Sequence, residues 1–154
     1  MIEPIRKTID VGCDPNTAFA IFTEKIADWW PLDGHTVSAM SGGTAKSLVL
    51  EPKVGGEVYE ITADGKREDW ARVTAFEPGA KLALAWHIMA PAAEATNVEV
   101  TFTSNGPERG GGTRVDLTHS GWEIMGDAGQ GSRDGYNGGW VRVFEECYGG
   151  ACAA

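Results

Sequence analysis

Residues 136–147 read YNGGWVRVFEEC, and the spacing of the apolar side chains in this stretch decides the fold class. These side chains recur at i, i+4, i+7, i+8 and i+11, at Tyr136, Trp140, Val143, Phe144 and Cys147. This period is typical of an amphipathic helix that rests one face on another layer. The Gly-rich segment 126–135 before the helix is expected to be a loop. The small residues 149–154 after it predict a flexible tail.

Upstream of this helix the sequence has the shorter alternation of β-strands. Six segments have strand character: 47–51, 56–63, 68–76, 81–88, 98–103 and 113–120. Turn signals such as Asp64-Gly65 and Pro78-Gly79 separate them at hairpin distances, which indicates an antiparallel meander.

The first 46 residues predict one more strand, two short helices and a loop. Residues 5–11 alternate as a half-buried strand does. Asp14-Pro15 is a typical helix start, and apolar residues follow at helical spacing up to Trp29-Trp30-Pro31. Residues 32–46 have no period and are expected to form a long loop.

Together these elements predict a single α+β domain over residues 1–148. Its curved antiparallel sheet of about six or seven strands wraps around the long C-terminal helix, and the two short helices follow strand one. We expect such a packing to leave a cavity between sheet and helix, closed by loops at one end.

Composition excludes several classes of function. The 154 residues carry a net charge of −9, which disfavours binding to nucleic acid or to an anionic membrane surface. There is no apolar run long enough for a signal peptide or membrane span, so we expect a cytoplasmic protein. Its three cysteines are expected to be reduced. Neither metal-ligand spacing nor a nucleotide-binding or hydrolase motif is found, and no cofactor is predicted.

Tryptophan is unusually frequent, with six residues at positions 29, 30, 70, 86, 122 and 140. Each large indole brings apolar area together with an N–H group that requires a partner. Any one of them is well explained as core filling. Spread over several elements, the six favour the walls of a cavity for a ligand.

Several short motifs occur in the order of these elements. They are Trp29-Trp30-Pro31, the stretch 50–56 (LEPKVGG), Tyr59-Glu60, Trp70 and the stretch 112–122 (GTRVDLTHSGW). Over Ile5 to Phe144 the chain resembles the SRPBCC (START-like) superfamily, most closely bacterial proteins similar to the activator of the heat-shock chaperone ATPase. The resemblance implies a helix-grip fold with a pocket between sheet and final helix. It leaves activity open, because this superfamily includes carriers, cyclases and chaperone activators.

Two polar residues on the strands, His119 and Glu60, are candidates for chemistry. His119 shares a strand face with Val115 and Leu117, so it should point inward, either as an acid–base group or as a neutral, fully hydrogen-bonded core residue. Because successive side chains of a strand point to opposite faces, either Glu60 or the pair Tyr59 and Ile61 points inward. A buried carboxylate in a pocket would be a functional candidate.

The leading hypothesis is a module that binds a small, largely apolar molecule, lipid-like or aromatic. The expected ligand-binding residues are Trp30, Glu60, Trp70, Trp86, Phe102, His119, Trp122, Tyr136, Trp140 and Phe144. A first alternative is an enzyme of the polyketide cyclase/dehydratase type that uses His119 and Glu60 as an acid–base pair. A second is a chaperone-linked protein-interaction domain, and the family resemblance also leaves a homodimer open.

Overall fold

The computed structural model describes residues 2–107 and 110–153 and contains one seven-stranded antiparallel sheet in the order β1-β7-β6-β5-β4-β3-β2. The strands are β1 (Ile5–Val11), β2 (Ser47–Leu50), β3 (Glu57–Ile61), β4 (Arg67–Glu77), β5 (Lys81–Trp86), β6 (Thr96–Ser104) and β7 (Thr113–Ser120). After β1, every strand pairs with its neighbour in sequence, which confirms the predicted meander, and β1 closes the order by pairing with β7. A 3-10 turn, η1 (Ala92–Glu94), lies between β5 and β6.

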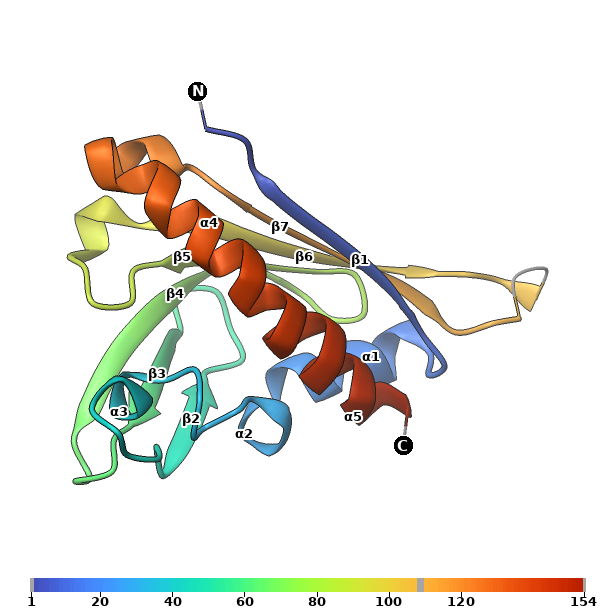
Figure 1. Cartoon of the computed structure of the whole chain (residues 1–154). Helices are drawn as coiled ribbons and strands as arrows, with labels where there is room; N and C mark the ends of the chain where they lie inside the picture. The colour runs from blue at the N-terminus through green and yellow to red at the C-terminus, as the bar shows by residue number, and fades with distance from the viewer. Residues whose placement is uncertain (1, 108–109, 154) are drawn as a thin grey trace.

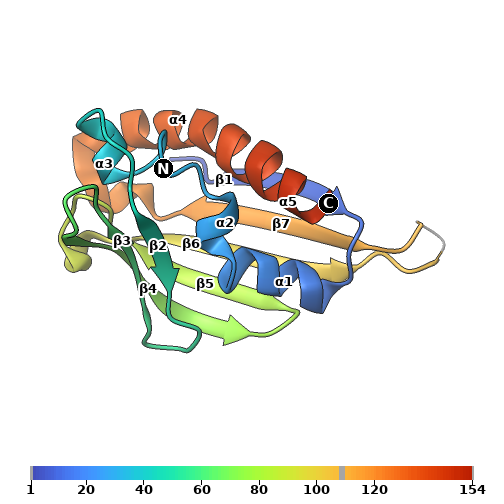
Figure 2. The same ribbon diagram turned by 90° about the horizontal axis from the view of Figure 1, so that it is seen from below.

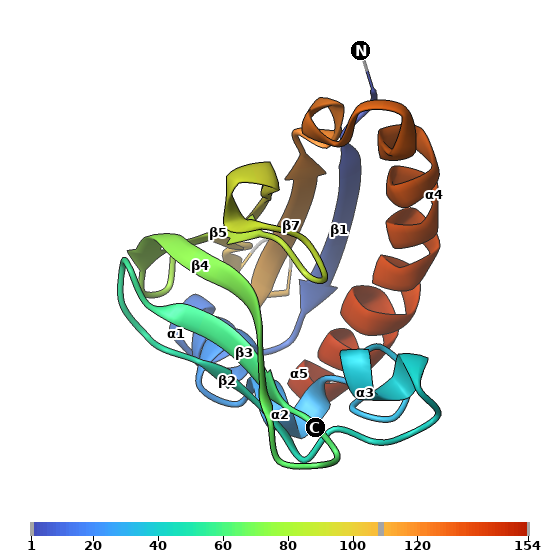
Figure 3. The same cartoon turned by 90° about the vertical axis from the view of Figure 1, so that its left-hand side faces the viewer.

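The long C-terminal helix crosses one face of this sheet diagonally (Figure 1). Seen from below, α1 (Pro15–Thr23) and α2 (Ile26–Trp29) lie against the same face (Figure 2). Viewed end on, the sheet curls toward the helix (Figure 3). The predicted α+β helix-grip architecture is therefore confirmed.

The start of α1 has the predicted chemistry. Asp14 accepts a hydrogen bond from the backbone N–H of Thr17 at 2.7 Å, and Pro15 occupies the first helical turn. The apolar face of the helix buries Phe19 and Phe22 against Phe102 of β6. The helix thereby seals one end of the concave face of the sheet.

The segment 32–46 differs from the predicted loop because it contains a short helix, α3 (Val37–Met40). Thr36 caps it by accepting the N–H of Ala39 at 3.0 Å. Four residues are too few to give a readable period. The turn is also held from outside by Glu60, a contact 22 and 23 residues away in sequence.

The final helix is longer than predicted. After η3 (Trp122–Ala128), with a kink at Gly126, α4 (Gly129–Trp140) begins inside the segment expected to be a loop. It continues as the π-helical segment η4 (Val141–Tyr148) and then as α5 (Gly149–Ala153). The glycines had suggested a loop, but packing across the sheet overrides their weak helix propensity.

The wider π turns shift which side chains reach the core. Phe144 and Tyr148 stack at 5.8 Å and are both fully buried, whereas Cys147 is only half-buried. The Tyr148 hydroxyl donates to the carbonyl oxygen of Ala18 at 2.7 Å and ties the helix to α1. Cys152 is buried too, so the tail expected to be flexible from residue 149 is helical through Ala153; Ala154 lies outside the described residues.

Candidate functional site

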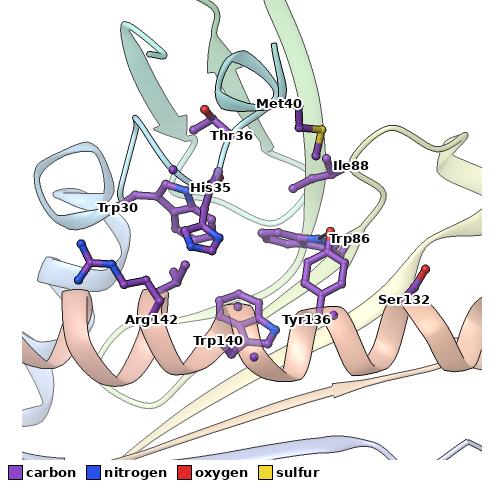
Figure 4. A pocket seen from close by; sticks show the side chains of 15 residues that line it. Trp30, His35, Thr36, Met40, Trp86, Ile88, Ser132, Tyr136, Trp140 and Arg142 are labelled. Carbon is purple, nitrogen blue, oxygen red and sulfur yellow. Dashed lines mark hydrogen bonds between the residues drawn. The ribbon is translucent and has the colours of Figure 1, made fainter. Parts of the chain in front are cut away.

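A cavity of about 660 Å³ lies between α4, the C-terminal end of β5 and the segment that leads to α3 (Figure 4). This volume lies in the range of small-molecule sites. Its walls are formed by Trp30, Gly34, His35, Thr36, Met40, Trp86, Ile88, Ser132, Gly135, Tyr136, Gly138, Gly139, Trp140, Arg142 and Val143. The predicted cavity between sheet and helix is present.

Three of the eight residues that the C-terminal helix contributes to the cavity are glycines. Gly135, Gly138 and Gly139 all line it. A Cβ atom placed at Gly135 or Gly138 would meet nothing within 4 Å, and one at Gly139 would first meet the His35 ring at 3.9 Å. At these positions the helix presents backbone to the cavity, and there is open space for a side chain.

Three indoles form the apolar part of the cavity, and each is fixed by its own N–H group. Trp30 donates to the carbonyl oxygen of His35 at 2.8 Å, and Trp86 donates to the Tyr136 hydroxyl at 3.0 Å. Trp140 donates to Nδ1 of His119 at 3.1 Å. The ring centroids of these three tryptophans lie 5.7 to 6.1 Å apart, so they form one continuous aromatic surface.

His119 lies behind this surface and is fully buried. An indole N–H can only donate, so Nδ1 of His119 is the acceptor from Trp140 and Nε2 carries the proton. Nε2 then donates to Oγ1 of Thr96 at 2.7 Å. Burial lowers the pKa of His119 to about 3. The ring is thus neutral with both nitrogens engaged, as in the core-residue alternative.

Glu60 points inward beside Val58, so of the two predicted orientations of this strand the one with a buried Glu60 is correct. The role of the buried carboxylate is structural. Its carboxylate accepts the backbone N–H groups of Val37 and Ser38 at 2.7 and 2.9 Å and the Ser38 hydroxyl at 2.6 Å. Trp70 adds its indole N–H at 3.2 Å. This carboxylate therefore anchors α3 to the sheet.

Four of the ten predicted ligand-binding residues line the cavity: Trp30, Trp86, Tyr136 and Trp140. The other six lie outside its walls: Glu60, Trp70, Phe102, His119, Trp122 and Phe144. They are all buried, and parity along a strand cannot distinguish a residue that lines a cavity from one packed behind it. His119 and Glu60 also have separate hydrogen-bond partners, so the predicted acid–base contact between them is not formed.

Sequence reasoning missed the polar residues of the cavity. His35 lines it from the segment 32–46, which was expected to be a loop. Arg142 lines it from the C-terminal helix. The available signal was the run of glycines that falls at helical spacing beside Tyr136. Tyr136 itself is partly buried, and desolvation raises the pKa of its phenol, so it stays protonated at neutral pH.

Two further features are absent from residues 2–107 and 110–153. These residues contain no group of three or more His, Cys, Asp or Glu side chains placed to hold a metal ion. Within the same ranges, none of the helices combines the length and apolar character needed to cross a bilayer.

Comparison with known proteins agrees with this architecture. The family described as "Activator of Hsp90 ATPase homolog 1-like protein" matches residues 13–146. An anthrahydroquino-gamma-pyrone synthase, Txn09, solved in complex with SUM, is 31% identical, with 88% of each chain covered and a TM-score of 0.60. A comparison with curated proteins gave no match.

More distant structures share the fold. An HSP90 activator from Plasmodium falciparum is 21% identical with a TM-score of 0.59, covering 92% of this chain and 90% of that one. The Aha1 dimer from Colwellia psychrerythraea is 17% identical with a TM-score of 0.58, covering 96% and 97%. The predicted resemblance is confirmed, and the chain belongs to the Activator of Hsp90 ATPase homolog 1-like protein family.

Proposed function

We propose that this protein binds a small, planar and largely apolar molecule in the cavity between α4 and the sheet. The observation that carries the proposal is the pairing of a glycine wall with an aromatic surface. Gly135, Gly138 and Gly139 line the cavity together with the indoles of Trp30 and Trp86. A flat molecule can lie in such a slot, with backbone on one side and π-faces on the other.

The glycines of the C-terminal helix support this proposal, because they lower the stability of the helix. Glycine inside a helix costs about 1 kcal/mol relative to alanine at each position. There is space for a side chain at Gly135 and Gly138, so packing against the protein does not require glycine there. Room for a ligand would explain glycine at these two positions.

The comparison with Txn09 supports an aromatic ligand. That protein is named for an anthrahydroquinone-type product and was solved with a bound compound, and 31% of its residues are identical over 88% of both chains. We therefore place aromatic, polyketide-like molecules ahead of acyl lipids as ligands for this chain.

Blocking the slot tests the proposal without weakening the fold. Gly135→Leu places a side chain in the cavity and also raises helix propensity by about 0.5 to 1 kcal/mol. We expect the variant to be at least as stable as wild type while its affinity for anthraquinone-2-carboxamide falls by about tenfold or more, or about 1.4 kcal/mol. Quenching of tryptophan fluorescence measures this affinity.

Gly131→Leu is the matched control. Gly131 lies one helical turn before Gly135, has equal space around its Cβ position and is outside the cavity wall. It gains the same helix propensity and should bind as wild type does. Wild-type affinity in Gly135→Leu would contradict binding in this slot.

A cyclase-type enzyme is a second candidate, and it is favoured by the synthase activity in the name of Txn09. In this candidate the proton-transfer groups would be His35 and Tyr136, which line the cavity, instead of the predicted pair His119 and Glu60. Loss of water from an aromatic polyketide on incubation would establish it if Tyr136→Phe abolished the reaction and Tyr59→Phe, at a tyrosine outside the cavity wall, did not.

A chaperone partner and a homodimer are further hypotheses. The family name and the Plasmodium falciparum activator support the first, and the Colwellia psychrerythraea dimer supports the second. Light scattering of the purified protein decides the oligomeric state. The cytoplasmic location also stays a prediction from the sequence.

A further inference from the structure

The polar groups around the cavity are not equally engaged within the described chain. The Thr36 hydroxyl donates to Leu32 and accepts from Ala39, so it is fully used. The Tyr136 oxygen accepts from Trp86, which leaves its own proton available to an acceptor in the cavity. A ligand oxygen beside Tyr136 would therefore receive a directed hydrogen bond.

Arg142 is the only formally charged side chain among the residues that line the cavity, all of which belong to the described part. It lies at the Trp30 end, with Trp140 between it and Tyr136 (Figure 4). The six residues from Tyr136 to Arg142 correspond to about 9 Å along a helix axis. The slot thus has a hydrogen-bond donor in its middle and a cation at one rim.

The Arg142 guanidinium is only loosely held in the protein. Its Nη1 lies 3.3 Å from Oε1 of Glu146, in an i, i+4 pair whose side chains are both 57% exposed. Such pairs are worth about 0.3 to 0.5 kcal/mol. One contact uses one of five N–H donors, so the remaining donors can turn to a ligand at the rim.

The net charge of the protein makes Arg142 a guide to the charge of the ligand. A net charge of −9 repels anionic molecules in general, so an anion would be attracted only where a local cation offsets the field. Guanidinium groups bind carboxylates and other anionic oxygens through paired hydrogen bonds. A neutral ligand would form no such charge-assisted pair with a cation at this position.

We infer that the ligand is a planar aromatic acid: its ring system fills the slot, a carbonyl or hydroxyl oxygen meets Tyr136, and a carboxylate or phenolate lies at the rim on Arg142. This inference rests on the proposed function and specifies the class of ligand. It also names Arg142 as the residue that selects anionic over neutral aromatic molecules.

Two probes of nearly equal shape test this selectivity. Anthraquinone-2-carboxylate carries the charge and anthraquinone-2-carboxamide does not, and calorimetry or fluorescence quenching gives both affinities. We expect wild type to prefer the carboxylate by about five- to tenfold, which corresponds to the strength of an exposed charge-assisted contact. In Arg142→Gln this preference should fall to about onefold.

Two control variants separate a local contact from net charge. Arg114→Gln removes an equally exposed, carboxylate-paired arginine on β7, outside the cavity wall, and should keep the preference for the carboxylate. Glu146→Gln releases Arg142 from its partner and should increase that preference.

The outcomes distinguish the two proposals. Equal binding of both probes to wild type, or an unchanged preference in Arg142→Gln, would overturn the inference and leave the aromatic-binding proposal standing. Binding of neither probe to wild type would overturn both.

Discussion

At the scale of single residues, the sequence predicts which way a side chain points, but not its hydrogen-bond partners. Alternation along β7 placed His119 inward correctly, and the structure buries it completely. Its partners Thr96 and Trp140 lie 23 and 21 residues away and come from β6 and α4. Hydrogen bonds to such distant groups decide whether a buried imidazole is reactive or structural, and no local pattern contains them.

The buried histidine predicts a pH dependence of stability. The folded-state pKa of His119 is about 3, whereas an exposed imidazole titrates near 6.5. Between these values the unfolded chain binds a proton that the folded chain does not, so stability is complete above pH 6.5 and falls as the pH is lowered. The slope from this residue is about 1.4 kcal/mol per pH unit below about pH 6.

Urea unfolding at several pH values between 7.5 and 5 measures this slope. His119→Gln keeps polar atoms for Trp140 and Thr96 but does not titrate. We expect it to lose this component of the slope, and an identical slope in both proteins would contradict the assignment.

At the scale of elements, strands and amphipathic helices were predictable because their periods are local. The helix around Trp140 was found from its stripe, yet its first turns were mistaken for a loop because Gly129, Gly131 and Gly135 have low helix propensity. The short helix α3 was missed for a different reason: it has only four residues, and a contact from β3 stabilises it in addition to its Thr36 cap.

The contact between Glu60 and α3 predicts a local effect. Glu60→Gln replaces one of the two carboxylate oxygens by an N–H₂ group, which then faces either the donors of Val37 and Trp70 or those of Ser38. Disrupting a buried charge-assisted network of this kind costs about 3 kcal/mol. We expect faster hydrogen exchange in residues 36–40, while β6 and β7 keep their protection.

The exposed Glu68→Gln is the control, because Glu68 pairs with Glu60 across β3 and β4 but faces solvent. It should exchange as wild type does. Unchanged exchange of α3 in Glu60→Gln would show that the carboxylate does not hold this element.

At the scale of the whole molecule, the order of elements was sufficient to predict a sheet curled around a helix, and from it a cavity. The position of the cavity walls was not predictable. Residues between Trp30 and Met40 line the cavity together with Trp86, and the glycines of α4 leave open space beside them. Neither arrangement can be read from a local sequence pattern. Six tryptophans indicated aromatic walls, but only three of them face the cavity.

That division among the tryptophans allows the most direct test of the central claim, that a planar aromatic molecule binds in this slot. All six indole N–H groups donate to a defined acceptor, so each should give a distinct NMR signal. On titration with anthraquinone-2-carboxamide we expect ring-current shifts for Trp30, Trp86 and Trp140, and much smaller changes for Trp29, Trp70 and Trp122. Shifts confined to the second group, or no shifts at saturating probe, would contradict the account.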